Sequence, residues 1–458
     1  MKKKQLILIL FYISNIYFSC SPEDKEIKEN NPPKNFQISS INFEGLNVTI
    51  DWNDAIDEDK DIVYYSLYVN DELISESTNS EGKLRTSYNK FYTGKIIATD
   101  KNGGTTELNF NFDSPLSKIV FYQTGSDVIN AYDLIENKIL WEKSGGLLPS
   151  FCIVNDRIFS GSDKIQALDI VTGEVKWSSN SLTYYDHFRD IVIQNNYAYA
   201  YSTDNELFCI DLKTKEKIWS RHFYEYEGPM GIDESQIYIA NRNDYDLYAL
   251  NNKTGNILWQ YVSYDRPYSY IIKSNPLLVD NIIYVGDNYY FLRALDKNTG
   301  ELLWQRKLDD AIYASPSIYK NMIIVASNTT IYAINKNGTI QWTWKHSDVY
   351  NFNSSPIVSN DKIYAPLTGN GDGKIICLDA NSGIQLWSAS CGPNPSSPVV
   401  YDKKLFFGDW NKKFYALNTS NGNTDWEITT KEYVSGSSTV VVGEGQEIYY
   451  SPVSPLKN

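Results

Sequence analysis

Two eleven-residue stretches decide the fold of this chain: Ala167-Leu-Asp-Ile-Val-Thr-Gly-Glu-Val-Lys-Trp177 and Ala294-Leu-Asp-Lys-Asn-Thr-Gly-Glu-Leu-Leu-Trp304. Both place a small residue, an aspartate, a glycine and a tryptophan at the same four positions. An aspartate at a strand end can cap the following turn, and glycine readily takes the positive φ of a tight turn. The pattern therefore predicts two antiparallel strands joined by a turn, with the tryptophan buried on the second strand.

The same pattern recurs along most of the chain and indicates a repeat protein. A tryptophan closes each copy, about every 41 residues, at Trp141, Trp177, Trp219, Trp259, Trp304, Trp342, Trp387 and Trp426. Eight residues before the tryptophan stands Asp or Asn (seven residues before it for Asn335), and two residues earlier stands Ala or Cys. Gly stands four residues before the tryptophan except at Asn137 and Lys215. Four short strands per copy, without a helical pattern, predict an all-β, eight-bladed β-propeller over residues 115–458.

The two ends of the repeat region predict how the ring closes. The first copy lacks an innermost strand before residues 118–122, and the run Ser438–Gly443 near the C-terminus can supply one. Pairing this run with the first copy would leave no open sheet edge in the ring. The apolar segment Ile448–Tyr450 is left without a place.

Residues 34–114 precede the repeats and read as short strands separated by turns, which predicts a small β-sandwich. Trp52 on an early strand and the hairpin at residues 97–103 resemble a fibronectin type III domain. The loop Asp54–Asp61 holds five carboxylates. Clustered carboxylates can hold Ca²⁺, and they are also typical of a solvated loop in an acidic protein, so both interpretations stay open.

The first 33 residues indicate export. Residues 1–19 combine three lysines with a short apolar run and resemble a lipoprotein signal peptide that ends before Cys20. That resemblance implies a lipid anchor on Cys20, and an ordinary secretory signal is the alternative. Residues 20–33 are polar and end in two prolines, which predicts a flexible tether.

Composition limits the classes of function. The chain has 458 residues, a net charge of −14, three His and five Cys. An acidic surface repels phosphate backbones, so we expect no nucleic-acid binding. The few His and Cys leave little material for a metal site, so no metal is expected in the propeller.

The repeats resemble the tryptophan-docking motif of quinoprotein (PQQ-like) propellers. The resemblance implies that each tryptophan is structural and wedges between adjacent blades. Quinoprotein dehydrogenases of this family use a vicinal disulfide beside the quinone, and this sequence has no adjacent cysteines. No common hydrolase or nucleotide-binding motif is present either. The sequence therefore predicts no cofactor and no enzymatic activity, with a quinoprotein dehydrogenase as a disfavoured alternative.

One face of the predicted propeller is rich in exposed aromatic residues. The loops that cross between blades share a face with the loops between each second and third strand. The candidate binding residues on that face are Tyr224, Tyr226, Tyr264, Arg266, Tyr268, Tyr270 and Trp410. Tyr, Trp and Arg on loops are typical of interfaces, and aromatic rings also stack on sugars. Packing of these rings against the rims is the alternative.

Together these features predict a lipid-anchored scaffold of the cell envelope that binds a protein or glycan. It would lie at the outer membrane, on the periplasmic or the cell-surface side. The alternative is a component that resembles the propeller lipoprotein of the outer-membrane β-barrel assembly machine. The sequence does not specify the ligand or the oligomeric state.

Overall fold

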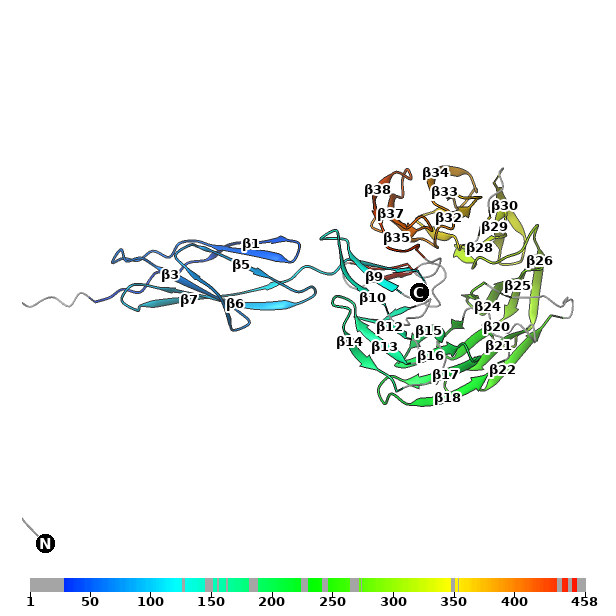
Figure 1. Ribbon diagram of the computed structural model, residues 1–458, viewed down its shortest axis with the longest axis horizontal. Coiled ribbons are helices and arrows are strands. Elements are labelled where there is room, and N and C mark those ends of the chain that lie inside the picture. The colour runs from blue at the N-terminus through cyan, green and yellow to red at the C-terminus, as the bar shows by residue number, and fades with distance from the viewer. Residues whose placement is uncertain are drawn as a thin grey trace, which may run out of the picture. The chain divides into compact units, whose positions relative to one another are not determined.

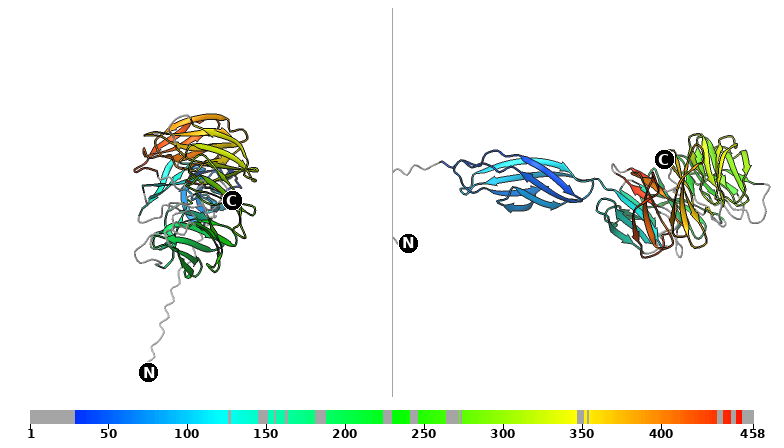
Figure 2. Two further views of the ribbon diagram at one scale, coloured as in Figure 1. Left: turned by 90° about the vertical axis from the view of Figure 1, so that its right-hand side faces the viewer. Right: turned by 90° about the horizontal axis from the view of Figure 1, so that it is seen from above.

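The computed structural model describes residues 29–125, 128–144, 151–154, 156–161, 164–180, 188–223, 230–240, 246–263, 272, 274–346, 351–352, 354–434, 439–443 and 447–450. The described residues form strands and connecting loops and include no helix (Figures 1 and 2). Accordingly, this part of the chain holds no apolar helix with the length to cross a membrane. The chain divides into two compact units: the first extends to Thr86 and includes Lys90–Ser114, and the second comprises Ser87–Asn89 and Pro115–Asn458.

The first unit contains two antiparallel sheets that share one core. The strands of the first sheet, in spatial order, are β1 (Ile38–Glu44), β2 (Asn47–Trp52) and β5 (Glu81–Arg85). Those of the second sheet are β4 (Glu72–Ser77), β3 (Tyr64–Val69), β6 (Phe91–Thr99) and β7 (Thr105–Asp113). Burial alternates residue by residue along β2 and β3, because successive side chains of a strand point to opposite faces. The inward residues form one cluster, in which the rings of Trp52 and Tyr65 lie 5.5 Å apart.

The described residues of the second unit form eight sheets that follow one another around a ring (Figure 1), numbered here in chain order. In sheets 2 to 8, four antiparallel strands pair in chain order. Sheet 2 has β11 (Cys152–Val154), β12 (Arg157–Gly161), β13 (Ile165–Asp169) and β14 (Val175–Ser178); sheet 3 has β15 (Phe188–Gln194), β16 (Tyr197–Ser202), β17 (Glu206–Asp211) and β18 (Lys217–His222). Sheet 4 has β19 (Gly231–Ile232), β20 (Gln236–Ala240), β21 (Asp246–Asn251) and β22 (Ile257–Val262); sheet 5 has β23 (Leu277–Val279), β24 (Ile282–Gly286), β25 (Phe291–Asp296) and β26 (Leu302–Lys307). Sheet 6 has β27 (Ser317–Tyr319), β28 (Met322–Ala326), β29 (Thr330–Asn335) and β30 (Ile340–Lys345); sheet 7 has β31 (Ile357–Ser359), β32 (Lys362–Thr368), β33 (Gly373–Asp379) and β34 (Gln385–Cys391). Sheet 8 has β35 (Val399–Tyr401), β36 (Lys404–Gly408), β37 (Lys413–Asn418) and β38 (Thr424–Thr429).

Sheet 1 joins the two ends of the second unit. Its spatial order is β10 (Lys138–Lys143), β9 (Val128–Asp133), β8 (Ile119–Thr124), β39 (Val440–Val442) and β40 (Ile448–Tyr450). The predicted pairing of the C-terminal run with the first copy is confirmed, because Val441 of β39 lies opposite Val120 of β8. The segment that the sequence left without a place becomes a fifth strand. Its Tyr450 hydroxyl donates a hydrogen bond to the carbonyl of Ile153 in sheet 2.

Apolar packing links each sheet to its neighbours. Every hydrophobic cluster of the second unit takes its residues from two neighbouring sheets. The last sheet packs on the first in the same way, where the rings of Tyr122 and Phe414 stack 4.1 Å apart. Removal of this apolar surface from water is the main force that holds neighbouring sheets together.

In seven of the eight sheets, the repeated small residue lies between two aromatic residues of its own sheet; in sheet 6 the residue on the second strand is Ile324. In sheet 5, Tyr284, Ala294 and Trp304 are directly opposite one another on three adjacent strands. Adjacent strands are about 4.8 Å apart, so strands two places apart are separated by roughly twice that distance. The ring centroids of Tyr284 and Trp304 are nevertheless only 5.8 Å apart, so both rings lean over the alanine. A larger residue at Ala294 would separate them.

Each tryptophan also reaches the next sheet, and we call that contact a seam. Trp304 Nε1 donates a hydrogen bond of 2.7 Å to the carbonyl of Lys336, in the turn that contains Gly338. A Cβ on Gly338 would lie 3.0 Å from the indole, and its φ is +81°, so the turn requires glycine for two reasons. The same hydrogen bond and the same glycine contact recur at Trp141, Trp219, Trp259, Trp342 and Trp387.

The turns themselves match the sequence-based expectation. The carboxylate of Asp296 accepts hydrogen bonds from the backbone N–H groups of Asn298 and Thr299, at 2.8 and 2.9 Å. Asn137 and Lys215, which replace glycine, adopt φ values of 52° and 67°. The turn therefore keeps the positive φ of the glycine position at both residues.

Candidate functional site

The ends of the sheets lie on two faces of the ring. One face carries the turns between third and fourth strands, including the glycine turns described above. The other, which we call the loop face, carries the loops between second and third strands and the segments that cross to the next sheet. Four large aromatic side chains in the described loops of this face are between 38% and 53% exposed: Tyr290, Tyr313, Trp410 and Tyr433.

Trp410 and Tyr433 form an exposed aromatic pair at sheet 8. Trp410 lies between β36 and β37, and Tyr433 lies after β38, where the chain crosses to sheet 1. Their ring centroids are 5.7 Å apart. Trp410 N donates to the carbonyl of Pro393 (3.0 Å), so three loops meet at this pair. An aromatic pair on backbone held in this way is a preorganised contact surface.

The buried Asp409 fixes the loops that carry this aromatic pair. Its side chain is fully buried and accepts hydrogen bonds from Gly392 N (2.7 Å), Lys413 N (3.2 Å) and the Tyr415 hydroxyl (2.8 Å). Its own carbonyl accepts from Val434 N at 2.9 Å. Burial, together with the Asp409 carboxylate, raises the pKa of Tyr415, so this phenol stays protonated and donates. Asp409 is a positioning residue for the aromatic pair above it.

The loop of sheet 5 repeats this design. Asp287 is fully buried, pairs with the guanidinium of Arg293, and accepts hydrogen bonds from Tyr289 N (2.8 Å) and Phe291 N (3.0 Å). Tyr290 follows with a φ of 76° and its ring 39% exposed. A bulky residue at positive φ is uncommon, so the loop holds this ring outward at a cost in backbone strain.

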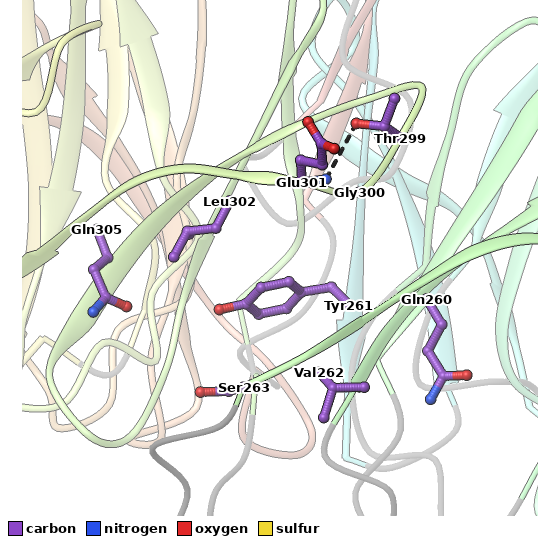
Figure 3. A pocket seen from close by; sticks show the side chains of 9 residues that line it. All are labelled: Gln260, Tyr261, Val262, Ser263, Thr299, Gly300, Glu301, Leu302 and Gln305. Carbon is purple, nitrogen blue, oxygen red and sulfur yellow. Dashed lines mark hydrogen bonds between the residues drawn. The ribbon is translucent and has the colours of Figure 1, made fainter.

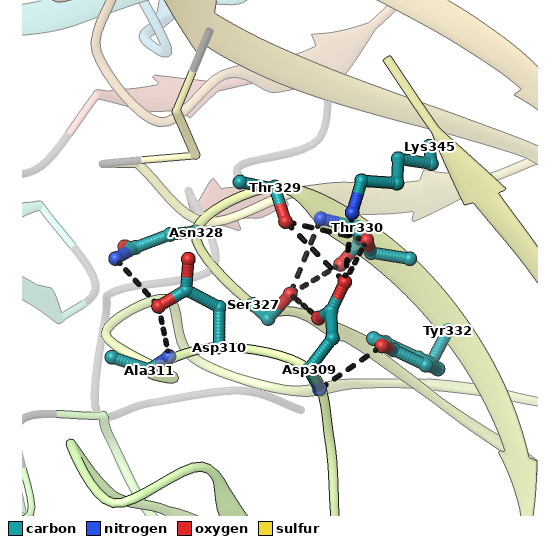
Figure 4. A network of polar contacts seen from close by, with 9 residues as sticks. All are labelled: Asp309, Asp310, Ala311, Ser327, Asn328, Thr329, Thr330, Tyr332 and Lys345. Atoms are coloured by element: carbon teal, nitrogen blue, oxygen red, sulfur yellow. Dashed lines mark hydrogen bonds and ion pairs between the residues drawn. The ribbon is translucent and has the colours of Figure 1, made fainter. Parts of the chain in front are cut away.

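Sheet 6 has a polar network in the corresponding place (Figure 4). The carboxylate of Asp309 accepts hydrogen bonds from the hydroxyls of Ser327 (2.8 Å) and Thr330 (2.6 Å), and Lys345 Nζ lies 3.4 Å away. Burial alone would raise the pKa of this carboxyl, but the hydrogen bonds, led by that of Thr330, outweigh it and lower the pKa to about 2. Next to it, Asp310 accepts from Ala311 N at 2.7 Å. These contacts fasten the crossing segment to its sheet, which is a structural role.

A belt of hydrogen bonds to serine hydroxyls connects the segments that lead into the innermost strands of four sheets, and sequence reasoning missed it. Asn275 N donates to Ser315 Oγ (3.0 Å), Ser315 N donates to Ser355 Oγ (2.8 Å), and Ser355 N donates to Ser397 Oγ (2.9 Å). A proline follows each of the three serines. The recurring Ser-Pro pair, spaced by about one repeat, was the signal that could have revealed the belt.

Most of the predicted binding residues lie outside the described part of the chain. Trp410 is described and is exposed on the loop face as expected. The residues that fall outside the described ranges are Cys20, Tyr224, Tyr226, Tyr264, Arg266, Tyr268 and Tyr270. The interface predicted for them stays a prediction.

The cysteines do not fit the quinone site of the resembling dehydrogenases. Cys209 and Cys377 occupy the small-residue position opposite Trp219 and Trp387, and burial raises the pKa of both thiols to about 12. Cys391 is the last residue of β34. It is a free thiol, as is Cys377.

The acidic loop Asp54–Asp61 makes hydrogen bonds with its own surroundings. Asp57 Oδ1 accepts from Asp61 N at 3.1 Å, and Asp59 Oδ2 accepts from Asn31 N at 2.9 Å. Within the described residues, no group of three or more His, Cys, Asp or Glu side chains is arranged to hold a metal ion. The described structure therefore offers no support for the calcium interpretation.

Sequence comparison finds one family that covers most of the chain. The sequence model of the family described as outer membrane protein assembly factor BamB matches residues 92–261 and 268–452. A tetrathionate hydrolase of Acidithiobacillus ferrooxidans is 27% identical over 222 residues, which is 47% of this chain and 39% of that protein. BamB of Legionella pneumophila is 29% identical over 144 residues, which is 30% of this chain and 35% of that protein. The chain thus spans little more than a third of the length of these relatives.

Solved structures with the same fold are PQQ-type β-propellers. BamB from Moraxella catarrhalis superposes with a TM-score of 0.54 at 16% identity, over 66% of this chain and 95% of that chain. Quinohemoprotein alcohol dehydrogenase from Comamonas testosteroni gives a TM-score of 0.51 at 13% identity, over 67% and 74% of the two chains. At these identities the likeness shows the fold alone.

One expectation from the sequence is corrected by these comparisons. The chain was expected not to be an enzyme, because no catalytic motif is present. A relative at 27% identity is named as a tetrathionate hydrolase, and alcohol dehydrogenases share the fold. The absence of a known motif was therefore not a ground for excluding catalysis, since this kind of propeller carries enzymatic members.

Proposed function

The chain belongs to the family described as outer membrane protein assembly factor BamB, and from that premise we propose that it binds a protein partner during outer-membrane protein assembly. The observation that carries the proposal is the extent of the family match, which includes residues of all eight sheets. This assignment replaces a general envelope scaffold as the main interpretation, and it favours a protein over a glycan as the ligand.

The architecture proposed for this role is a tethered propeller. The eight sheets are the blades of one closed eight-bladed propeller, in keeping with the β8–β39 pairing and with the packing of sheet 8 on sheet 1. Residues 34–114 form a fibronectin type III-like sandwich. Residues 1–19 are a lipoprotein signal peptide, and residues 20–33 tether the chain to a lipid on Cys20. The protein would then lie at the outer membrane, within reach of its partners there.

We propose the aromatic pair Trp410–Tyr433 as part of the docking surface. Exposed Trp and Tyr side chains supply most of the binding energy in many interfaces, because they bury a large area with few rotatable bonds. The pair rests on the buried Asp409 and on backbone hydrogen bonds, so little order has to be gained on binding. Tyr433 was missed by sequence reasoning because its loop carries no repeated residue.

The proposal is tested in the native host. A strain that lacks the gene should contain less folded β-barrel protein in its outer membrane, measured by heat-modifiable mobility on gels. The wild-type gene should restore the level, and the double variant Trp410→Ala/Tyr433→Ala should not. Tyr64→Ala, which removes a 53% exposed ring from the first unit, is the matched control and should restore it.

The two parts of the proposal fail separately. If deletion leaves the folded β-barrel proteins at their normal level, the assembly role is wrong. If the double variant complements as well as Tyr64→Ala does, the assembly role stands and the aromatic pair is not part of the docking surface.

A hydrolytic activity is the second candidate, favoured by the 27% identity to the tetrathionate hydrolase. The purified chain would be incubated with tetrathionate, and the remaining substrate measured by anion chromatography. A loss of tetrathionate above that seen with heat-denatured protein would support this candidate, and an unchanged concentration would rule it out for this substrate.

A further inference from the structure

At two seams the chain supplies an arginine to the glycine turn of the next sheet. Arg221 and Arg306 each stand two residues after the docking tryptophan of their sheet. Arg221 Nε donates to the carbonyl of Gly255 at 2.7 Å, and Arg306 Nε donates to the carbonyl of Gly338 at 2.8 Å. These two guanidinium groups therefore occupy the space between an outer strand and the adjacent turn.

At the seam between sheets 4 and 5, the same position is Tyr261. The register is unchanged, because Tyr261 lies opposite Leu247 as Arg306 lies opposite Leu292. Trp259 still docks on the next turn, with its indole N–H 2.9 Å from the carbonyl of Lys297. The backbone of the arginine site is thus present at this seam, whereas the arginine is not.

The place that arginine fills at the seams formed by Trp219 and Trp304 is an open pocket at the seam of Trp259 (Figure 3). Its volume is about 450 Å³, within the usual range for a ligand site. The ring of Tyr261 lies across the pocket, between the turn of sheet 5 and the end of β22. The pocket is lined by Gln260, Tyr261, Val262, Ser263, Thr299, Gly300, Glu301, Leu302 and Gln305.

The lining favours a cation. Glu301 is its one formally charged residue, and Gly300 is the counterpart of Gly255 and Gly338, whose carbonyls accept from arginine. The buried Arg293 lies behind Ser263, 3.5 Å from its hydroxyl, but this guanidinium is paired with Asp287. A flat donor group that can pair with a carboxylate and lie against an aromatic ring suits this combination.

We propose that this pocket binds the guanidinium group of an arginine side chain from a partner protein, at the site where sheets 3 and 5 use an arginine of their own. The repeat supplies the template: Nε of the incoming arginine donates to the Gly300 carbonyl as Arg306 Nε does to Gly338. Glu301 then pairs with the terminal nitrogens, and the ring of Tyr261 provides the stacking surface. The site lies on the outer rim, apart from the aromatic pair on the loop face.

The probe is N-acetyl-arginine methylamide, titrated into the full chain and followed by ligand-observed NMR, with the neutral citrulline analogue as its matched ligand. We expect saturable binding of the arginine probe and none of the citrulline analogue. Glu301→Gln should weaken binding at least about tenfold, because a charge-assisted hydrogen bond is lost. Glu174→Gln changes the equivalent turn residue of sheet 2 and should leave binding unchanged.

A second variant tests the template itself. Tyr261→Arg should place an arginine of the chain in the pocket and abolish binding of the probe. Failure of the wild-type chain to bind the probe, equal binding of the citrulline analogue, or unchanged binding by Glu301→Gln would each overturn the proposal. If Tyr261→Arg does not fold, the Glu301→Gln variant still tests the proposal, because Glu301 is exposed and its substitution leaves the core unchanged.

Discussion

Two neighbouring seams of the ring differ at the turn position that is glycine in most repeats. Between sheets 3 and 4, Trp219 docks over Gly255, and its indole N–H donates to the carbonyl of Asn252 at 3.0 Å. Between sheets 2 and 3, Trp177 faces Lys215 instead, and its buried indole N–H has no hydrogen-bond partner among the described residues.

The difference separates the two functions of the glycine. Lys215 has a φ of 67° and its N–H donates to Asp211 at 2.8 Å, as the N–H of Gly255 does to Asn251, so the turn keeps its backbone. What the lysine changes is the room for the indole ring beside the turn. At the glycine seam an added Cβ on Gly255 would come within 2.6 Å of the Trp219 ring, and Lys215 carries such a Cβ. The ring at the lysine seam must stand further off, and the indole loses the neighbouring carbonyl.

The largest test of the seam is removal of a tryptophan at a regular one. Trp304→Ala should lower the free energy of unfolding by about 3 kcal/mol, the low end for such a large-to-small change, because the partly buried indole leaves a cavity. Trp177→Ala should cost about 1 kcal/mol less, because its indole hydrogen bond is not made. Trp410→Ala, on the loop face, should change stability by less than about 0.5 kcal/mol. Urea denaturation measures all three free energies. Equal losses at Trp304 and Trp410 would contradict a structural role for the tryptophans that close the repeats.

A regular seam can be converted into the irregular one. Gly255→Lys should destabilise the protein by about 1–3 kcal/mol, because it combines a positive φ for a non-glycine residue with loss of the Trp219–Asn252 hydrogen bond. The indole N–H resonance of Trp219 should also exchange with solvent faster. A variant as stable as the wild type would show that the close approach of the ring contributes nothing.

The regular seams are also what the sequence could predict. Their determinants keep a fixed distance from the tryptophan, so the pairing of the third and fourth strands, the turn caps and the positive φ of the turn glycine all followed from spacing. The aromatic residue on the second strand did not, because the distance to the tryptophan varies from 18 residues for Phe159 and Trp177 to 23 for Tyr364 and Trp387. Because the loops between the second and third strands differ in length, this aromatic position does not recur at a fixed spacing in the sequence.

Sites that depend on loops could be predicted only in part. Trp410 stood out as a tryptophan outside the column, whereas Tyr433 and the serine belt become neighbours through folding alone. The three-residue strand β40 carries no repeat residue, and its place is fixed by pairing with β39. The pocket at Tyr261 is visible only when the seams are compared with one another in space.

The reverse conversion should repair the irregular seam. Lys215→Gly should stabilise the protein by about 1 kcal/mol, because it relieves the positive φ and lets the Trp177 indole approach the next turn. The measurement is again urea denaturation, with Lys213→Gly, two residues earlier in the same turn, as the control for loss of a lysine. Destabilisation by Lys215→Gly would mean that the lysine, 5.9 Å from the Trp177 ring, contributes more through its charge than its Cβ costs.

The smallest expected effect is on the pH dependence of stability, which should differ between the seams and the loop face. Seam contacts of the tryptophans involve indole N–H groups and carbonyls, which do not titrate, whereas Asp309 on the loop face has its pKa lowered to about 2. Because this folded-state value is below the unfolded value of about 3.9, the carboxylate stabilises the fold above pH 4 and loses its contribution as the pH falls toward 2. The side chain is 34% exposed, so screening should keep the contribution below about 1 kcal/mol.

Asp309→Asn should therefore be less stable than the wild type at pH 5, and the difference should shrink at pH 3 and vanish near pH 2. The effect of Lys215→Gly should be the same at pH 5 and pH 3, because lysine remains charged at both. If the Asp309→Asn difference instead stayed constant with pH, the carboxylate charge would play no part in fastening the crossing segment. The hydroxyls of Ser327 and Thr330 would then hold that segment equally well through a neutral amide.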